Sequence, residues 1–134
     1  MTTAEDVTLV RNAIHNPKEP RHFMRIVRAN ETRSVSVGDT IIAQSADALV
    51  VKEVGFDLYD HVTYFPREGV DMEALVGIDK STHCPLKGNT EYFDIVVDGN
   101  HVAEAAWSYV DTIDVASDLH DLIGFDTTKV TASW

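Results

Sequence analysis

Short hydrophobic segments separated by turn residues dominate the chain from residue 23 onward. Runs rich in β-branched and aromatic residues, bounded by Gly, Pro, Asn and Asp, are typical of antiparallel strands. The strands that this pattern predicts are residues 23–29, 34–37, 41–44, 48–54, 61–65, 92–97, 101–109 and 122–125. For the first of these a helix stays an alternative, because Arg25 and Arg28 interrupt the strand pattern.

Helical patterns are short and few. Residues 71–76 fit one or two helical turns capped by Asp71, and residues 113–120 fit a short helix. Near the N-terminus, residues 3–15 predict an amphipathic helix, which the prolines of residues 16–20 end. Its apolar face consists of Val7, Val10 and Ile14.

These elements predict a mainly β fold, all-β or α+β, in the form of a single compact antiparallel sheet or barrel-like domain with short helices and an N-terminal helical arm. The arm comprises residues 1–22, the mainly-β core domain residues 23–126, and a C-terminal tail residues 127–134. We expect the tail to be frayed. The arm packs on the core, covers a sheet edge or reaches a second subunit, so a homodimer stays open.

The clearest predicted hairpin turns at residues 98–100, an Asp-Gly-Asn sequence with two registers. A turn on its Gly-Asn pair places Tyr92 opposite Trp107. A turn on its Asp-Gly pair places Tyr92 opposite Ala105 and makes the aromatic pair diagonal. In both registers Trp107 and Tyr109 lie on one face of their strand, because side chains alternate.

Length and composition limit the classes of protein to which the chain can belong. The 134 residues suit one domain, which at this size buries about two-thirds of its unfolded surface. A single cysteine excludes an internal disulfide, and the N-terminus has neither the basic start nor the apolar run of a secretion signal. No stretch approaches the ~20 apolar residues of a membrane helix. We therefore expect a cytoplasmic protein without a membrane partner.

The formal net charge of −11 is concentrated in the second half of the chain. From Glu91 onward nine acidic residues stand against one basic residue, Lys129. Nucleic-acid binding depends on Lys and Arg that neutralise phosphates, so nucleic acid is not an expected partner. The acidic surface favours solubility and also suits a salty habitat.

One short turn holds the only cysteine, a histidine and a lysine. Residues 84–87 have proline at the second position, which is typical of a β-turn, and Gly88 can take the positive φ that follows. This geometry draws Cys84 and Lys87 together. Lys87 or His83 could then activate the thiol, so Cys84, His83 and Lys87 are the candidate catalytic group. The alternative is a small apolar Cys84 beside a solvated Lys87.

Aromatic and basic side chains elsewhere are candidates for the wall of a binding site. A proline ends one predicted strand and leaves Arg67 on a loop, where it meets an anionic ligand or pairs with a neighbouring carboxylate. Tyr64, Trp107 and Tyr109 have aromatic faces with polar tips, which suit the margin of a core or the wall of a pocket. With Arg67 and Lys87 they form the candidate ligand-binding set.

Neither a metal site nor a cofactor site is predicted. One cysteine and scattered histidines do not supply the four ligands of a structural zinc site. Asp114, Asp118 and Asp121 share a helical face, but such a run is typical of a solvated surface. The sequence also has no Gly-rich phosphate loop.

Four short sequence blocks follow one another in an order that is typical of a known family. They are Asp47-Ala48-Leu49, Tyr64-Phe65-Pro66-Arg67, Thr82-His83-Cys84-Pro85-Leu86-Lys87-Gly88 and Ala105-Ala106-Trp107-Ser108-Tyr109. Spread over residues 33–126, they resemble a bacterial family catalogued as domain of unknown function 427. The chain departs from the family at Leu86, where a tyrosine is usual, in a less aromatic C-terminal strand, and in having no proline shortly after the last block.

The resemblance implies a shared fold and a shared pocket, but no established activity. Some members carry a nucleotidyltransferase-like label. That chemistry needs a phosphate cradle and carboxylates that hold Mg²⁺, and the sequence does not supply them.

We therefore expect a module that binds a small molecule, with an anion as one option, in a pocket near Cys84 and Lys87. Two alternatives stay open. One is an enzyme that uses Cys84 as nucleophile or redox centre, and the other is a structural or interaction domain that assembles through its N-terminal arm.

Overall fold

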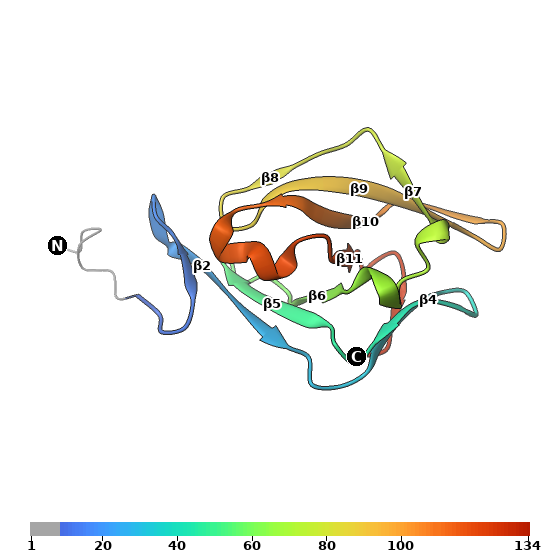
Figure 1. The fold of residues 1–134 in the computed structure, drawn as a ribbon, viewed down its shortest axis with the longest axis horizontal. Helices are drawn as coiled ribbons and strands as arrows, with labels where there is room; N and C mark the ends of the chain where they lie inside the picture. Colours follow the sequence, from blue (N-terminus) through green and yellow to red (C-terminus); the bar gives the residue numbers. More distant parts are fainter. Residues whose placement is uncertain (1–8) are drawn as a thin grey trace.

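The computed structural model describes residues 9–134, which form two β-sheets (Figure 1). The strands are β1 (Ile14–Asn16), β2 (Glu19–Arg28), β3 (Arg33–Val37), β4 (Thr40–Ser45), β5 (Leu49–Val54), β6 (Val62–Phe65), β7 (Leu75–Ile78), β8 (His83–Cys84), β9 (Gly88–Val97), β10 (Asn100–Thr112), β11 (Ile123–Phe125) and β12 (Thr131–Ala132). Short 3-10 helices connect them: η2 (Arg67–Gly69), η3 (Met72–Ala74) and η4 (Asp114–Leu119). The predicted mainly-β class is confirmed.

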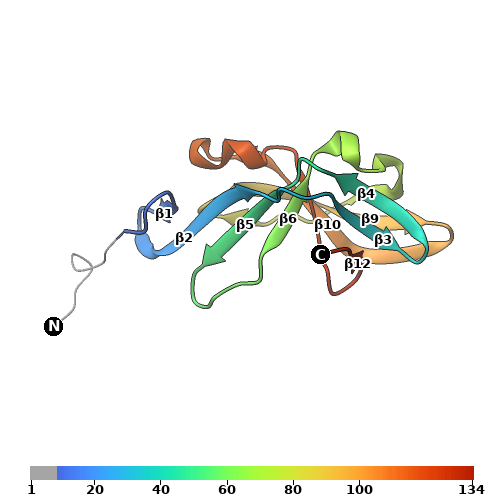
Figure 2. The ribbon, with the colours of Figure 1, turned by 90° about the horizontal axis from the view of Figure 1, so that it is seen from below.

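The two sheets differ in size and position. The larger has the strand order β1-β2-β5-β6-β11-β10-β9-β7, with β8 also paired to β9. The smaller has the order β12-β3-β4 and lies at the end of the molecule opposite β1 (Figure 2). All strand pairs among the described residues are antiparallel, as the pattern of short strands and turns predicted.

The buried side chains form two clusters, of which the main core joins the two sheets. In the main core, Val35 and Ile42 of the smaller sheet share one cluster with Phe65, Ile95 and Ile123 of the larger sheet. A second cluster consists of Met24, Val51, Tyr64, Leu86, Tyr109, Ala116 and Leu119. Alternate side chains of a strand point to opposite faces, so neighbouring residues of β6 serve different clusters. The second cluster supports the candidate site.

The hairpin of β9 and β10 combines both predicted registers. Its turn is the Asp-Gly pair, because Val97 lies opposite Asn100. Tyr92 nevertheless lies opposite Trp107, which the alternative turn predicted. The aromatic pair is therefore directly opposed, although the turn alone would have placed it diagonally.

A β-bulge in β10 explains this register. The pairing shifts between Val102 and Ala106, so that β10 has extra residues relative to β9. Within the bulge Glu104 has a φ of +49°, and its N–H donates to Asp94 Oδ1 at 2.9 Å. The side chain of Lys129 donates to the carbonyl of Ala103 at 2.9 Å. Hydrogen bonds from outside the ladder thus hold the inserted residues.

The predicted N-terminal helix, residues 3–15, is wrong where the structure describes it. Asn12 has a φ of +56°, and β1 pairs with β2. The N–H of Val10 donates to His15 Nε2 at 3.0 Å and closes a loop in place of a helical turn. Apolar residues spaced by three and four fit a helix, but backbone pairing with β2 competes with that weak local preference. Residues 3–8 of the predicted helix lie outside the described residues.

The C-terminal tail is not frayed, in contrast to our expectation. Thr131–Ala132 form β12, which pairs with β3. The ring of Trp134 lies 6.0 Å from the ring of Phe65 and 5.2 Å from the guanidinium carbon of Arg33. Trp134 therefore contacts both sheets. The division of the chain at residues 22 and 126 stays a prediction.

Other local predictions hold. Residues 23–29 are strand rather than helix, since they fall almost entirely in β2. Gly38 has a φ of +58° in the turn between β3 and β4, and Asp71 Oδ1 accepts from the N–H of Glu73 at 3.2 Å, which caps η3. None of the helices in the described part of the chain is long and apolar enough to cross a membrane. A cytoplasmic location stays a prediction.

Candidate functional site

The β-turn predicted at Cys84 is confirmed. The N–H of Lys87 donates to the carbonyl of Cys84 at 3.1 Å, with Pro85 at the second position. Gly88 follows with a φ of +125°, and a Cβ atom there would lie 2.0 Å from the carbonyl oxygen of Asp111. Only glycine fits this close approach to β10. The turn brings Lys87 Nζ to 3.6 Å from Cys84 Sγ, as predicted.

Lys87 also joins two residues from distant strands. Its side chain is only 7% exposed, and its ammonium forms an ion pair with Glu53 Oε1 of β5. Glu53 Oε2 lies 2.8 Å from His22 Nε2 of β2. Cys84, Lys87, Glu53 and His22 thus form a hydrogen-bonded row, which we call the polar row.

Charge and burial act in opposite directions on the polar row. Burial raises the pKa of Glu53, but the ammonium of Lys87 and the hydrogen bonds from Lys87 and His22 outweigh it, so the pKa lies below its ordinary value. Burial raises the pKa of Tyr64 and Tyr109 well above the ordinary value. The site therefore places an ionised carboxylate near phenols that stay neutral.

An open cavity of about 360 Å³ lies against the polar row. It is lined by His22, Val51, Glu53, Tyr59, Asp60, Val62, Tyr64, Lys87, Tyr92, Trp107 and Tyr109. All four tyrosines of the chain are in this set. Val51, Tyr64, Lys87 and Tyr109 are buried and make the floor, whereas Tyr59 and Asp60 are exposed and make the rim.

Gly124 makes room for the aromatic wall. It pairs with Trp107 on one side and Tyr64 on the other. A Cβ atom at this position would lie 2.9 Å from Trp107 Cε2 and 3.0 Å from Tyr64 Cε1. Trp107 Nε1 donates to the hydroxyl of Tyr64 at 3.2 Å, and the Trp107 ring lies 6.2 Å from that of Tyr92. Three strands thus supply one continuous aromatic surface.

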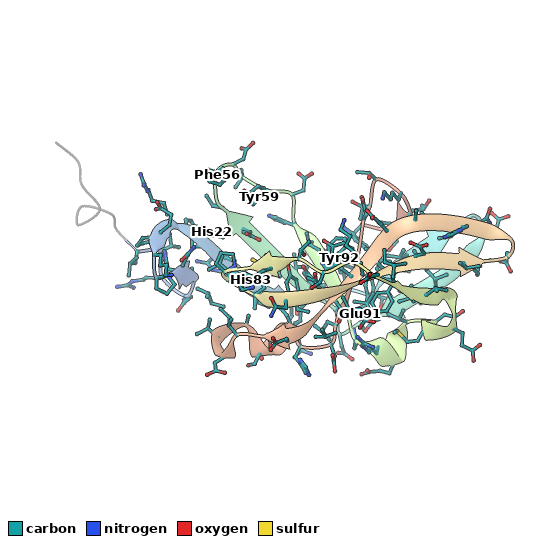
Figure 3. All side chains as sticks on the ribbon, turned by 90° about the horizontal axis from the view of Figure 1, so that it is seen from above. His22, Phe56, Tyr59, His83, Glu91 and Tyr92 are labelled. Atoms are coloured by element: carbon teal, nitrogen blue, oxygen red, sulfur yellow. The ribbon has the colours of Figure 1, made fainter. Side chains whose placement is uncertain are left out.

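The loop between β5 and β6 carries the rim of the cavity. Figure 3 shows Phe56 and Tyr59 on this loop, which projects from the sheet near His22. The Tyr59 ring packs over Gly55, where a Cβ atom would lie 2.9 Å from Tyr59 Cε2. The N–H of Tyr59 donates to the carbonyl of Glu53 at 3.2 Å, so the backbone fixes the rim to the polar row.

Four of the five residues of the predicted ligand-binding set line the cavity: Tyr64, Lys87, Trp107 and Tyr109. Arg67 does not. Its Nε donates to the carbonyl of Asp121 at 2.6 Å, and its guanidinium also donates to Ser108 Oγ at 3.2 Å. The Nε and Nη2 donors of its guanidinium group are thus already bonded, away from the cavity.

The predicted catalytic group is only partly brought together. Cys84 is half-buried beside Lys87. His83 is exposed, and its Nδ1 lies 2.8 Å from Asn89 Oδ1. Neighbouring residues of an extended chain point to opposite sides, which explains why the side chain of His83 lies away from that of Cys84. The catalytic roles of these residues stay predictions.

Several lining residues were not predicted from the sequence, above all Glu53 and His22. One signal was present for Glu53: it lies two residues after Val51 in an apolar strand and so shares its inward face. Asp60 and Tyr59 follow that strand on a loop. Nothing local marks His22, because its partner is 31 residues away.

Chemically, the site combines aromatic faces with a few polar groups. Within residues 9–134, no group of three or more His, Cys, Asp or Glu side chains is arranged to hold a metal ion. The polar row instead offers hydrogen-bonding carboxylate, ammonium and imidazole groups beside neutral phenols.

Fold and site together define a small two-sheet β protein with a polar row in an aromatic cavity. The chain belongs to the family described as domain of unknown function (DUF427), whose family model matches residues 25–134. The match extends past the resembling blocks at both ends. No curated protein matches the chain.

Proposed function

We propose that this protein is a binding module that holds a small molecule in the aromatic cavity, against Glu53 and Lys87. The observation that carries the proposal is a buried ion pair at the wall of an open cavity. Burying an ion pair often adds little net stability compared with apolar residues of similar volume. A polar pair kept in such a place supports a role in recognition.

The size and composition of the cavity support the same proposal. Ligand pockets are typically about 300–1,000 Å³, with mostly apolar and aromatic walls and a few placed polar groups. The cavity, at about 360 Å³, is at the small end of that range. Tyrosine and tryptophan give rigid contact surfaces with polar tips, so little side-chain entropy is lost on binding.

Native mass spectrometry of freshly purified protein, followed by ligand-observed NMR of a fragment library, tests the proposal. We expect bound small molecules in the wild-type protein. Val62→Phe should abolish binding, because Val62 lines the cavity and a phenyl ring would fill it. Val96→Phe is the matched control, since Val96 is 44% exposed and lies outside the cavity lining. No ligand, or equal binding by both variants, would contradict the proposal.

A second candidate function is thiol chemistry at Cys84. It is favoured by the ammonium of Lys87, 3.6 Å from the sulfur, since a nearby cation stabilises thiolate. The test is the alkylation rate of Cys84 against pH in wild-type protein and Lys87→Met. A thiol that titrates near ~8.5 in both proteins behaves as a free cysteine and removes the basis of this mechanism.

A further inference from the structure

We propose that the ligand of the aromatic cavity is a small organic cation, with its ammonium group against the tyrosine and tryptophan rings near Asp60. This inference rests on the proposed binding function and specifies its substrate class. Charge, ring chemistry and the field of the whole protein support it separately.

One carboxylate at the cavity, that of Asp60, has no cationic partner among the described residues. The ammonium of Lys87 is paired with Glu53 and largely shielded from solvent. Asp60, on the rim, makes no side-chain hydrogen bond or ion pair with any other described residue. The lining has two carboxylates, one ammonium and one imidazole, and the carboxylate without a partner among the described residues is the exposed one.

The walls suit a cation as well. The face of an aromatic ring attracts a positive charge within about 6 Å of its centroid, and cages of such rings bind quaternary ammonium groups. Two lysines already use rings of this cavity in this way. Lys87 Nζ lies 5.8 Å from the Tyr109 centroid, and Lys80 Nζ lies 4.4 Å from the Tyr92 centroid. Trp107 and the exposed Tyr59 have no such cation among the described residues.

The site offers fewer cationic groups to an anion. The guanidinium of Arg67 is bonded to Asp121 and Ser108 outside the cavity. Lys87 already donates to Glu53 and Cys84, which leaves one N–H, and an anion bound there would lie next to the carboxylate of Glu53. The net charge of −11 further attracts cations and repels anions.

Three probes of nearly the same shape separate the ligand classes: choline, its neutral analogue 3,3-dimethyl-1-butanol, and the anion 3,3-dimethylbutyrate. Binding is followed by the fluorescence of Trp107 in a Trp134→Phe background, because the chain has two tryptophans. We expect choline to bind about tenfold more tightly than the neutral alcohol, as a partly desolvated cation–π contact allows. The carboxylate should bind most weakly.

Asp60→Asn tests the placement of the charge. It should reduce the affinity for choline several-fold and leave that for the neutral alcohol unchanged. Asp57→Asn is the matched control: Asp57 is on the same loop but does not line the cavity. Equal losses in both variants would mean that only the overall charge matters, which overturns a cation site at Asp60.

The outcomes separate the two proposals. If the alcohol or the carboxylate binds at least as tightly as choline, the organic cation is overturned, while ligand binding in the cavity stands. If none of the three probes binds, the cation is overturned too, and the fragment screen with Val62→Phe and Val96→Phe decides on the binding function by itself.

Discussion

Among single residues, Glu53 and Lys87 are those at which a role in ligand recognition can best be tested against a role in stability. Removing two charges from water costs several kcal/mol for each, and their attraction repays this only when every polar atom has a partner. Here Glu53 bonds to both Lys87 and His22, and Lys87 bonds to both Glu53 and Cys84. The pair is satisfied, but it has no clear energetic advantage over apolar side chains of similar size.

Removing one charge of the pair should therefore destabilise the protein more than removing both. Lys87→Met leaves a partly buried carboxylate and should lower the free energy of unfolding by about 2–4 kcal/mol. Glu53→Leu with Lys87→Met should lie within about 1 kcal/mol of wild type. Urea unfolding measures all three proteins. A double variant as unstable as the single one would mean that the fold itself requires the ion pair.

The lowered pKa of Glu53 gives a pH dependence of stability. The unfolded chain takes up a proton at the ordinary pKa, and the folded chain does so only at lower pH. The contribution of Glu53 is thus fully present above the ordinary pKa and is lost as pH falls through the folded value. The difference in unfolding free energy between wild type and Glu53→Gln should shrink as the pH falls below the ordinary pKa of glutamate, about 4.3. A constant difference would contradict the lowered pKa.

Sequence separation decides how much of the site could be predicted. Cys84 and Lys87 are three residues apart, and a proline at the second position of their turn indicates the geometry. The partner of Lys87 is 34 residues away, and only the assembled sheet brings it close. Arg67 illustrates the same limit, since a carbonyl and a hydroxyl from other strands and loops occupy its fork.

Among the elements, two glycines at turns both have a positive φ but differ in their surroundings. Gly88→Ala should cost about 3 kcal/mol or more, because strain at positive φ is added to a backbone clash with Asp111. Gly99→Ala, at a φ of +79° with nothing within 4 Å, should cost only about 1–2 kcal/mol. Thermal unfolding of both variants compares them. Equal costs would mean that the start of β9 moves away from β10 easily.

The bulge of β10 depends on Asp94, whose pKa is lowered by the N–H of Glu104 and by His101. Asp94→Ala should speed hydrogen exchange at the Glu104 amide and alter the environment of Trp107. His101→Ala is the control, because it removes only the bond to the other carboxylate oxygen. Slow exchange retained in Asp94→Ala would show that Lys129 suffices to hold the bulge.

Turns and helix caps could be predicted where interactions between residues close in the sequence determine them. The hairpin at Gly38 and the Asp71 cap depend on neighbours in the sequence, and both were found. The helix predicted for residues 3–15 was wrong over the described residues 9–15, because apolar spacing in so short a segment also suits a strand that pairs with a neighbour. The bulge had no local signal, since its bonds come from β9 and from Lys129.

For the whole molecule, the charge of −11 is the dominant property. Like charges destabilise the compact state, and salt screens exposed ones beyond about 10 Å at 0.1 M. The unfolding midpoint should therefore rise from low to molar NaCl. Because sulfate and other strongly excluded salts stabilise most proteins, chloride is the informative salt. A flat or falling midpoint would mean that the carboxylates are already compensated by their neighbours.

The solitary thiol of the chain makes the molecule convenient for spectroscopy. Cys84 is the only cysteine, it is half-buried, and its sulfur lies next to Lys87 at the cavity. A maleimide dye or nitroxide would attach at one position without any engineered substitution. In the Trp134→Phe background, energy transfer from Trp107 to such a dye would then report the occupancy of the cavity directly.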